Sequence, residues 1–227
     1  MGVRLGTAAW FCGLALILAQ AFPARAQSSN AAPDLSFNDA AFDPSKIPSF
    51  PDAAKQALAN ANQLLKSGES HAYVFVASPD LSVWQLNGIP KSAVVYSLAD
   101  TARVALQVCE YAFGAPCFIL ALNGHDTQER AGGWAAQPSM FFRGPSDFDA
   151  STVPFILSGQ RAQMDAYRRV PGNRAFVVTT GGGWLSRTGD TILKAITAAE
   201  TDCATVFKNA TCVLYAVNDR VVFTPTP

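Results

Sequence analysis

Apolar and polar positions along the chain indicate four helices and several short strands, in the same order in two halves. Between Asp52 and Lys66, apolar side chains recur every three or four residues and Gly68 follows, which predicts an amphipathic helix. A second helix is expected from about Gln160 to Arg169, with Ser158 as its N-cap and Pro171-Gly172 as its end.

Short runs rich in β-branched and aromatic residues predict the strands. Ser78-Pro79-Asp80 and Gly181-Gly182-Gly183 suit hairpin turns between pairs of these runs, and Asn218-Asp219 suits a last hairpin turn. The expected strands comprise residues 72–77, 81–86 and 93–96 in the first half and 175–180 and 184–187 in the second.

A further helix in each half carries a cysteine on its apolar side. The spacing of the apolar residues after Asp190, the expected N-cap, places Cys203 on the buried side, and the spacing around Cys109 does the same in the first half. Cys117 and Cys212 each open the apolar strand that follows, so a bridge within each half would join a helix to the next strand.

Uncommon residues recur in the same order in the two halves, which predicts a tandem repeat. The matching pairs are residues 42–48 (FDPSKIP) with 148–154 (FDASTVP), Trp84 with Trp184, and 117–123 (CFILALN) with 212–218 (CVLYAVN).

The predicted fold is therefore α+β, a tandem repeat of a helix-hairpin-helix-strand module. Each module would form a small antiparallel or mixed sheet covered by helices on one face, and the two modules would form either separate domains or one unit with a shared core. Module 1 spans residues 42–124, a linker spans 125–147 and module 2 spans 148–227, while residues 27–41, rich in Ser, Asn, Ala and Pro, predict a flexible arm.

Residues 1–26 indicate export. Arg4 precedes an apolar stretch at residues 5–21, and Ala24-Arg25-Ala26 provides the small residues that signal peptidase requires. A retained membrane anchor fits less well because the uninterrupted apolar run is shorter than the about 20 residues of a membrane span. We expect a signal peptide, a periplasmic or secreted location, and no stable membrane insertion after cleavage.

Four cysteines would then remain in an oxidising compartment, where an even number favours disulfides. Of the three possible pairings, the repeat favours Cys109 with Cys117 and Cys203 with Cys212. Zinc binding fits less well because each pair is too widely spaced, and a redox Cys-x-x-Cys motif is absent. We expect no metal and no cofactor.

Composition narrows the function classes further. Hydrophobic residues make up 49% of the 227 residues and charged residues 15%, which is typical of a globular protein rather than a disordered one. The 17 Lys and Arg residues balance 17 Asp and Glu residues and form no cluster, so nucleic-acid binding is not expected.

The polar residues suggest structural rather than catalytic roles. His125-Asp126 could form a general-base pair, but adjacent side chains on a loop seldom converge, so a solvated loop is favoured. Asp43 and Asp149 stand at the start of each half, where capping explains them better than a catalytic dyad. Gly181-Gly182-Gly183 suits a turn better than an anion site. We expect no catalytic residue.

Trp134, Phe141 and Phe142 form an apolar cluster in the linker, outside the expected elements. Such a cluster either packs between the modules or exposes a surface for a partner. These three residues are the candidate binding residues.

The second half carries a pattern of Ala-Phe-Val-Val, Gly-Gly-Trp, a helix with Cys203, and then Cys-Val-Leu-Tyr-Ala-Val-Asn from Cys212. This pattern resembles uncharacterised exported bacterial proteins with small repeated modules of paired cysteines. The resemblance covers mostly residues 174–223 and more loosely 71–124. It implies a Gram-negative envelope location and no particular activity.

Two classes of function follow. The first is a non-catalytic binding module for an unknown protein or small ligand, which would bind between the modules or at the linker aromatics. The alternative is a periplasmic enzyme, such as a hydrolase, with an unrecognised site between the modules. The absence of catalytic sequence motifs favours binding over catalysis.

Overall fold

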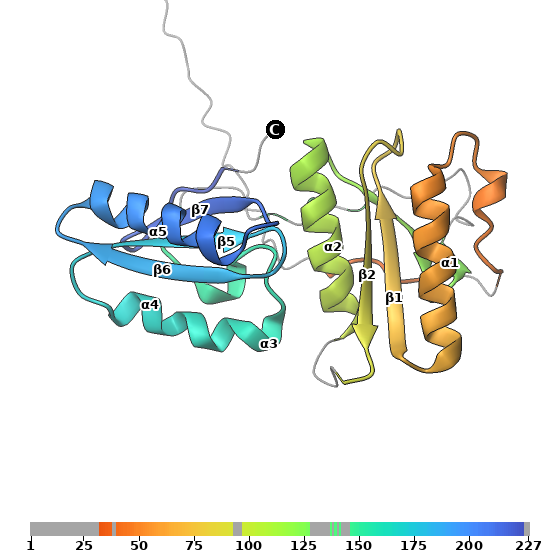
Figure 1. Ribbon diagram of the computed structural model, residues 1–227, viewed down its shortest axis with the longest axis horizontal. Coiled ribbons are helices and arrows are strands. Elements are labelled where there is room, and N and C mark those ends of the chain that lie inside the picture. The colour runs from red at the N-terminus through yellow and green to blue at the C-terminus, as the bar shows by residue number, and fades with distance from the viewer. Residues whose placement is uncertain are drawn as a thin grey trace, which may run out of the picture.

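The computed structural model describes residues 32–37, 40–92, 97–127, 137, 139, 141 and 146–224. In these residues the chain is an α+β protein with two four-stranded antiparallel sheets, one in each half. Figure 1 shows the two halves side by side, with helix α2 (Leu98–Phe113) facing the second half. The predicted signal peptide at 1–26, the predicted strand at 93–96, Trp134 and Phe142 lie outside the described residues.

The first sheet has the strand order β2-β1-β3-β4, so β1 is central and β2 lies at an edge. Helix α1 ends at Gly68, whose φ of 74° allows the left-handed turn that leads into β1. The remaining elements of this half are η1 (Pro44–Lys46), α1 (Asp52–Ser67), β1 (Ser70–Ala77), β2 (Trp84–Pro90), β3 (Phe118–Leu122) and β4 (His125–Asp126).

The second sheet has the order β6-β5-β7-β8, again with an edge strand that forms a hairpin with the central strand. Its elements are η2 (Ala150–Thr152), α3 (Ser158–Arg161), η3 (Ala162–Asp165), α4 (Ala166–Arg169), β5 (Asn173–Thr179), β6 (Trp184–Gly189), α5 (Ile192–Val206), β7 (Cys212–Val217) and β8 (Arg220–Val221).

Helices cover both faces of each sheet, so the prediction of helices on one face is wrong. Side chains alternate along β1: Val74 and Val76 pack with α2, whereas Tyr73 and Phe75 pack with α1. In the second half, α5 covers one face, and α4 with η3 covers the other (Figure 1). Each central strand is apolar on both faces, and both faces therefore need a helical cover.

Two predicted helix starts also differ. The expected helix at 160–169 consists of α3, η3 and α4 in succession, and Leu157 rather than Ser158 is the N-cap of α3. Thr191 caps α5 instead of Asp190: its hydroxyl accepts from the backbone N–H of Lys194, while the Asp190 carboxylate pairs with the Lys194 ammonium at 2.8 Å.

Part of the expected flexible arm, residues 32–37 and 40–41, contacts the first half and the expected linker. The backbone N–H of Asp34 donates to the Gln137 side chain at 3.0 Å, and Ala41 forms a β-bridge with His125. His125 in turn belongs to β4, so the sheet extends into residues expected in the linker.

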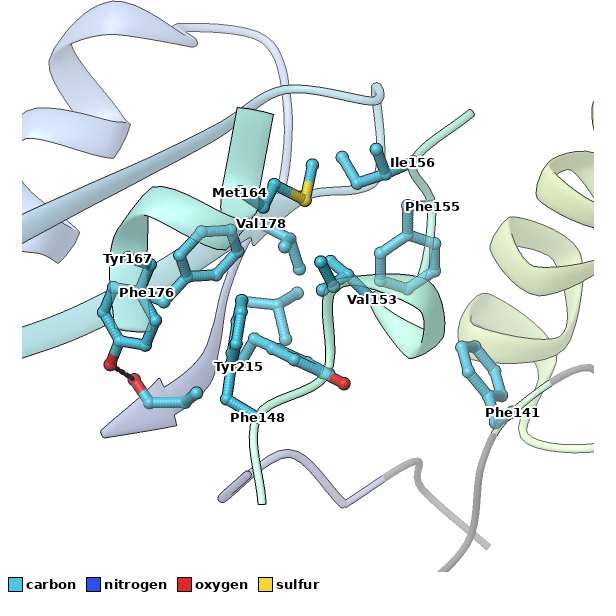
Figure 2. Packing of buried hydrophobic residues seen from close by; sticks show 13 residues of the cluster. Phe141, Phe148, Val153, Phe155, Ile156, Met164, Tyr167, Phe176, Val178 and Tyr215 are labelled. Carbon is cyan, nitrogen blue, oxygen red and sulfur yellow. Dashed lines mark hydrogen bonds between the residues drawn. The ribbon is translucent and has the colours of Figure 1, made fainter. Parts of the chain in front are cut away.

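The main apolar core of the second half reaches across to the first (Figure 2). Phe155 lies at its border, 5.7 Å from the Phe141 ring and 5.5 Å from the Tyr111 ring of α2 between centroids. Phe141 also contacts Phe223, near the end of the described chain. The two halves therefore share an apolar interface.

Disulfides join each long cysteine-bearing helix to the strand that follows it. Cys109 bonds to Cys117 with an S–S distance of 2.03 Å, and Cys203 bonds to Cys212 with 2.07 Å. This is the pairing expected from the sequence. Each bridge closes a loop within its own half.

Candidate functional site

A groove of about 550 Å³ lies between the two halves. One wall consists of β2 and α2, and the other consists of residues 155–160 and the turn at 180–182. The described residues that line the groove are uncharged. They combine amide, hydroxyl and backbone groups with apolar side chains.

The β1–β2 pairing sets the direction of the side chains on the first wall. Gln85 lies opposite Val76 and Asn87 lies opposite Val74, and both valines pack with α2. Opposite residues of an antiparallel pair share a face of the sheet, so the Gln85 and Asn87 side chains point to the α2 side, where the groove lies.

The second wall consists of two turns with unusual backbone conformations. Phe155 has a φ of 62° and Gly182 a φ of 85°, both in the left-handed region. The two turns touch, because a Cβ at Gly182 would lie 3.6 Å from the Phe155 carbonyl oxygen. The hydroxyl of Thr179 accepts from the Gly183 N–H at 2.8 Å and holds the second turn closed.

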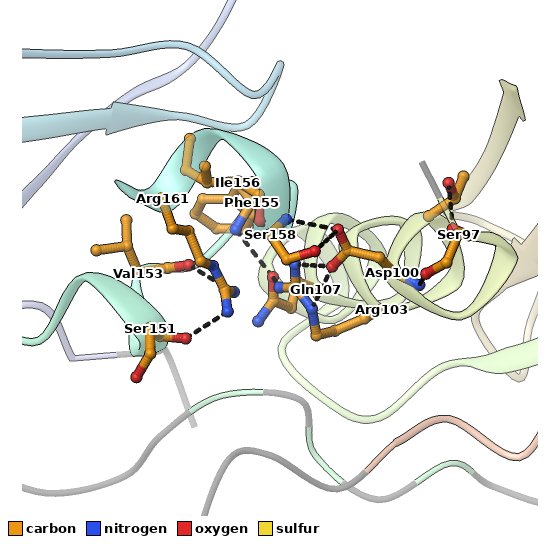
Figure 3. A network of polar contacts seen from close by, with 11 residues as sticks. Ser97, Asp100, Arg103, Gln107, Ser151, Val153, Phe155, Ile156, Ser158 and Arg161 are labelled. Carbon is orange, nitrogen blue, oxygen red and sulfur yellow. Dashed lines mark hydrogen bonds and ion pairs between the residues drawn. The ribbon is translucent and has the colours of Figure 1, made fainter. Parts of the chain in front are cut away.

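Partly buried hydrogen bonds fix the two walls relative to each other (Figure 3). One carboxylate oxygen of Asp100 accepts from the Ser158 backbone N–H at 2.5 Å and from its hydroxyl at 2.8 Å. The guanidinium of Arg103 donates to the Ile156 carbonyl at 2.6 Å. Asp100 and Arg103 lie on α2, so this helix holds the second wall in place through hydrogen bonds.

Gln107 adds a third contact from the same helix. Its side-chain oxygen accepts from the Phe155 backbone N–H at 2.8 Å and from Arg103 at 3.0 Å. The contact supports Phe155 directly where it lines the groove. Hydrogen bonds of this kind keep the shape of a binding site constant without a ligand.

Three charged residues close to the groove, Asp100, Arg103 and Arg161, have structural roles. Burial raises the pKa of Asp100, but the hydrogen bonds from Ser158 and the Arg103 guanidinium outweigh it, so the pKa lies below its ordinary value. Asp100 and Arg103 side chains are only 9% and 11% exposed. Burial, followed by repulsion from Arg103, lowers the pKa of the Arg161 guanidinium to about 10.

Of the predicted binding residues, only Phe141 belongs to the described residues. Phe141 is 4% exposed and packs between the halves, against Phe155 and Phe223. Trp134 and Phe142 lie outside the described part of the chain, so the exposed aromatic surface stays a prediction.

The other polar residues discussed from the sequence take structural positions. The carboxylates of Asp43 and Asp149 each accept from the backbone N–H two residues later and cap a short 3₁₀ turn. His125 lies in β4, where its ring is 5.2 Å from the Phe37 ring. These residues are not brought together in one site.

The residues that build the groove were not among those predicted from the sequence. Asp100, Arg103 and Gln107 recur at helical spacing on α2, whose other residues are mostly apolar. This polar stripe is a signal that could have revealed a buried interface. No comparable signal exists for Gln85 and Asn87, because their role depends on which strand lies at the sheet edge.

None of the helices in the described part of the chain is both long and apolar enough to cross a membrane. Among the described residues, no three His, Cys, Asp or Glu side chains gather as metal ligands would. No protein family model, curated protein or solved structure matches the chain. Function is therefore inferred from the groove.

Proposed function

We propose that this protein is a non-catalytic binding module that holds its ligand in the groove between its two halves. The main evidence is a groove of about 550 Å³ whose walls come from both halves and are joined by buried and partly buried hydrogen bonds. Ligand sites in proteins commonly have volumes of roughly 300 to 1,000 Å³ and a preformed shape.

Binding is favoured over hydrolysis by the chemistry of the lining. General acid–base catalysis needs a titratable group within hydrogen-bond reach of the substrate. The described lining residues are uncharged, and the carboxylate of Asp100 beneath them is engaged by Ser158 and Arg103. A neutral ligand that hydrogen-bonds to amides and hydroxyls suits such a groove.

The proposal includes export to the periplasm or the exterior. The pattern of residues 1–26 supports it, as do the two disulfides, which form and persist in oxidising compartments.

We further propose that the two halves are copies of one module. Asn123 and Asn218 support this, since each accepts through its side chain from a backbone N–H of the central strand, Tyr73 at 2.8 Å and Arg174 at 3.1 Å. Their φ values, 53° and 52°, also agree. The shared strand order around β1 and β5 supports the same proposal.

A screen of neutral small molecules and capped peptides, followed by amide NMR on the full chain, tests binding in the groove. Bound ligand should shift the signals of Gln85, Asn87 and Gln160. The variant Gln160→Arg places a charge in the groove and should abolish these shifts, whereas Gln163→Arg, on the exposed side of the same segment, should keep them. Absence of any binder, or binding that Gln160→Arg leaves intact, rejects the proposal.

A further inference from the structure

The outer edge of β2 differs from an ordinary strand edge because a hollow lies on each of its two faces. The groove touches Leu86 and Gly88 from the α2 side. A second hollow of about 290 Å³, between α1 and the β1–β2 hairpin, touches the same two residues from the opposite face. The strand edge at Leu86 and Gly88 thus lies between two hollows.

The hydrogen-bond pattern shows which backbone groups of β2 face outward. The Ser78 N–H donates to the Val83 carbonyl at 2.9 Å, and the pairs that follow alternate between bonded and non-bonded. By this alternation Gln85 and Asn87 bond to β1, whereas Leu86 and Gly88 direct their N–H and C=O groups away from the sheet. No described residue hydrogen-bonds to these outward groups.

We propose that the ligand of the groove is an extended, uncharged peptide segment of a partner protein, which adds to β2 as a further antiparallel or parallel strand at Leu86 and Gly88. This inference rests on the proposed binding function. Successive side chains of an added strand point to opposite faces, so they would enter the groove and the second hollow in turn. Backbone hydrogen bonds would supply affinity, and the hollows would select the side chains.

The lining of the hollows defines the chemistry of the peptide. On the α1 side, Ala57, Ala61 and Leu64 offer an apolar surface, which suits a small aliphatic side chain. On the groove side, Gln85 and Asn87 offer amide groups, which suit a Ser or Thr side chain. Neither lining includes a charged residue among the described ones, so a charged peptide side chain would lose hydration without compensation.

The corresponding edge strand of the second sheet, β6, differs from β2 in charge. Arg187 lies on β6 and pairs with Asp202 of α5, and a charged residue on an edge is a common protection against strand addition. The β2 segment Trp84–Pro90 contains no charged residue. As far as the described residues show, neither charge nor a hydrogen-bonded neighbour blocks a partner strand at this edge.

Amide hydrogen exchange on the full chain tests strand addition directly. The probe is a set of capped heptapeptides in which Val alternates with Ser or Thr. A bound peptide should slow exchange at the Leu86 and Gly88 amides roughly tenfold or more, because these N–H groups would then donate to its backbone. Methylation of alternate peptide nitrogens should weaken binding about tenfold for one set of nitrogens and leave it unchanged for the other.

A matched pair of variants locates the strand. A Cβ at Gly88 would lie 3.7 Å from the Ser70 hydroxyl, which is an ordinary contact, so Gly88→Lys is expected to fold. It should weaken peptide binding roughly tenfold, because the ammonium would enter the apolar hollow. Thr188→Lys, at the corresponding exposed position of β6, should have no effect. If Gly88→Lys does not fold, the methylated peptides decide the question on the wild-type chain.

The outcomes separate the two proposals. Neutral small molecules that shift the groove signals, without protection of Leu86 and Gly88 by any peptide, would overturn the peptide inference and leave the groove proposal standing. Absence of all binding would overturn both. Protection that rises with protein concentration in the absence of peptide would identify a second copy as the occupant and would also overturn the proposal of a partner peptide.

Discussion

The carboxylate of Asp100 in α2 accepts two hydrogen bonds from Ser158, 58 residues further along the chain. Its other oxygen accepts from Arg103, which also reaches the Ile156 carbonyl. A single carboxylate therefore joins the two halves beside the groove. The relative position of the groove walls depends on it.

Replacement of Asp100 by Ala should lower the free energy of unfolding by about 3 to 5 kcal/mol, because Arg103 would stay buried without its carboxylate partner. Urea denaturation measures the change. Asp52→Ala, which removes an exposed ion pair with Lys55, is the control and should leave the denaturation midpoint in place. Equal midpoints for the two variants would contradict the role of Asp100.

The same carboxylate should make stability depend on pH in the acid range. The pKa of Asp100 is lower in the folded chain than its ordinary value, so its contribution is present above about pH 4 and is lost as the pH falls through the folded pKa. In the variant Asp100→Asn, stability should therefore fall less steeply as the pH is lowered. Thermal unfolding at a series of pH values measures this dependence. An unchanged dependence would assign the loss to other carboxylates.

Local patterns in the sequence were sufficient to predict those helices and strands that are determined by residues close together in the chain. The spacing between Asp52 and Lys66, followed by Gly68, predicts α1 almost to the residue. The predicted role of Ser158 as an N-cap was wrong for a physical reason. A serine that precedes apolar residues at helical spacing resembles an N-cap, but the hydroxyl of Ser158 donates to Asp100, which lies on another helix. Nothing near Ser158 in sequence indicates that partner.

The groove was predictable only in outline. A site between the two halves was one of two places that the sequence analysis considered. The free edge of β2, however, depends on the strand order, which long-range pairing of β1 with β3 decides. The alternation around Leu86 indicates a strand but not which side of it stays unpaired. Edge position is a property of the whole sheet.

Each disulfide should contribute separately to stability. Loss of the Cys203–Cys212 bridge in the double variant to Ser should lower the free energy of unfolding by roughly 2.5 to 3 kcal/mol, because the bridge restricts a short loop in the unfolded chain. The corresponding Cys109 and Cys117 double variant should show a similar loss, since its loop is about as long. Denaturation without reductant measures both. A negligible loss in either would show that the bridge is dispensable there.

Alkaline pH should destabilise the first half through Tyr73. Burial raises the pKa of its hydroxyl to about 12, although its hydrogen bond to the Asn62 side chain at 2.6 Å opposes the rise. Because the folded pKa exceeds the unfolded value of about 10, this contribution is complete below pH 10 and is lost as the pH rises toward 12. The variant Tyr73→Phe should make the alkaline limb shallower in thermal unfolding. A limb of unchanged steepness would point to other tyrosines.

Two of the three consecutive glycines before Trp184, Gly181 and Gly183, should differ in their tolerance of a side chain. A Cβ at Gly183 would lie 2.5 Å from the Phe207 ring. A Cβ at Gly181 would make only ordinary contacts, with the Ala210 methyl group at 3.6 Å and the Thr179 hydroxyl at 3.8 Å. Gly183→Ala should therefore cost about 1 to 3 kcal/mol in the free energy of unfolding, and Gly181→Ala should be neutral or slightly stabilising.

A second substitution tests whether the Phe207 ring is the cause. In the Gly183→Ala background, Phe207→Leu removes the ring atoms that the new methyl group would meet, so part of the lost stability should return. The cycle is measured by urea denaturation of the wild type, both single variants and the double variant. Strictly additive losses would mean that the Phe207 ring is not the cause of the loss in Gly183→Ala.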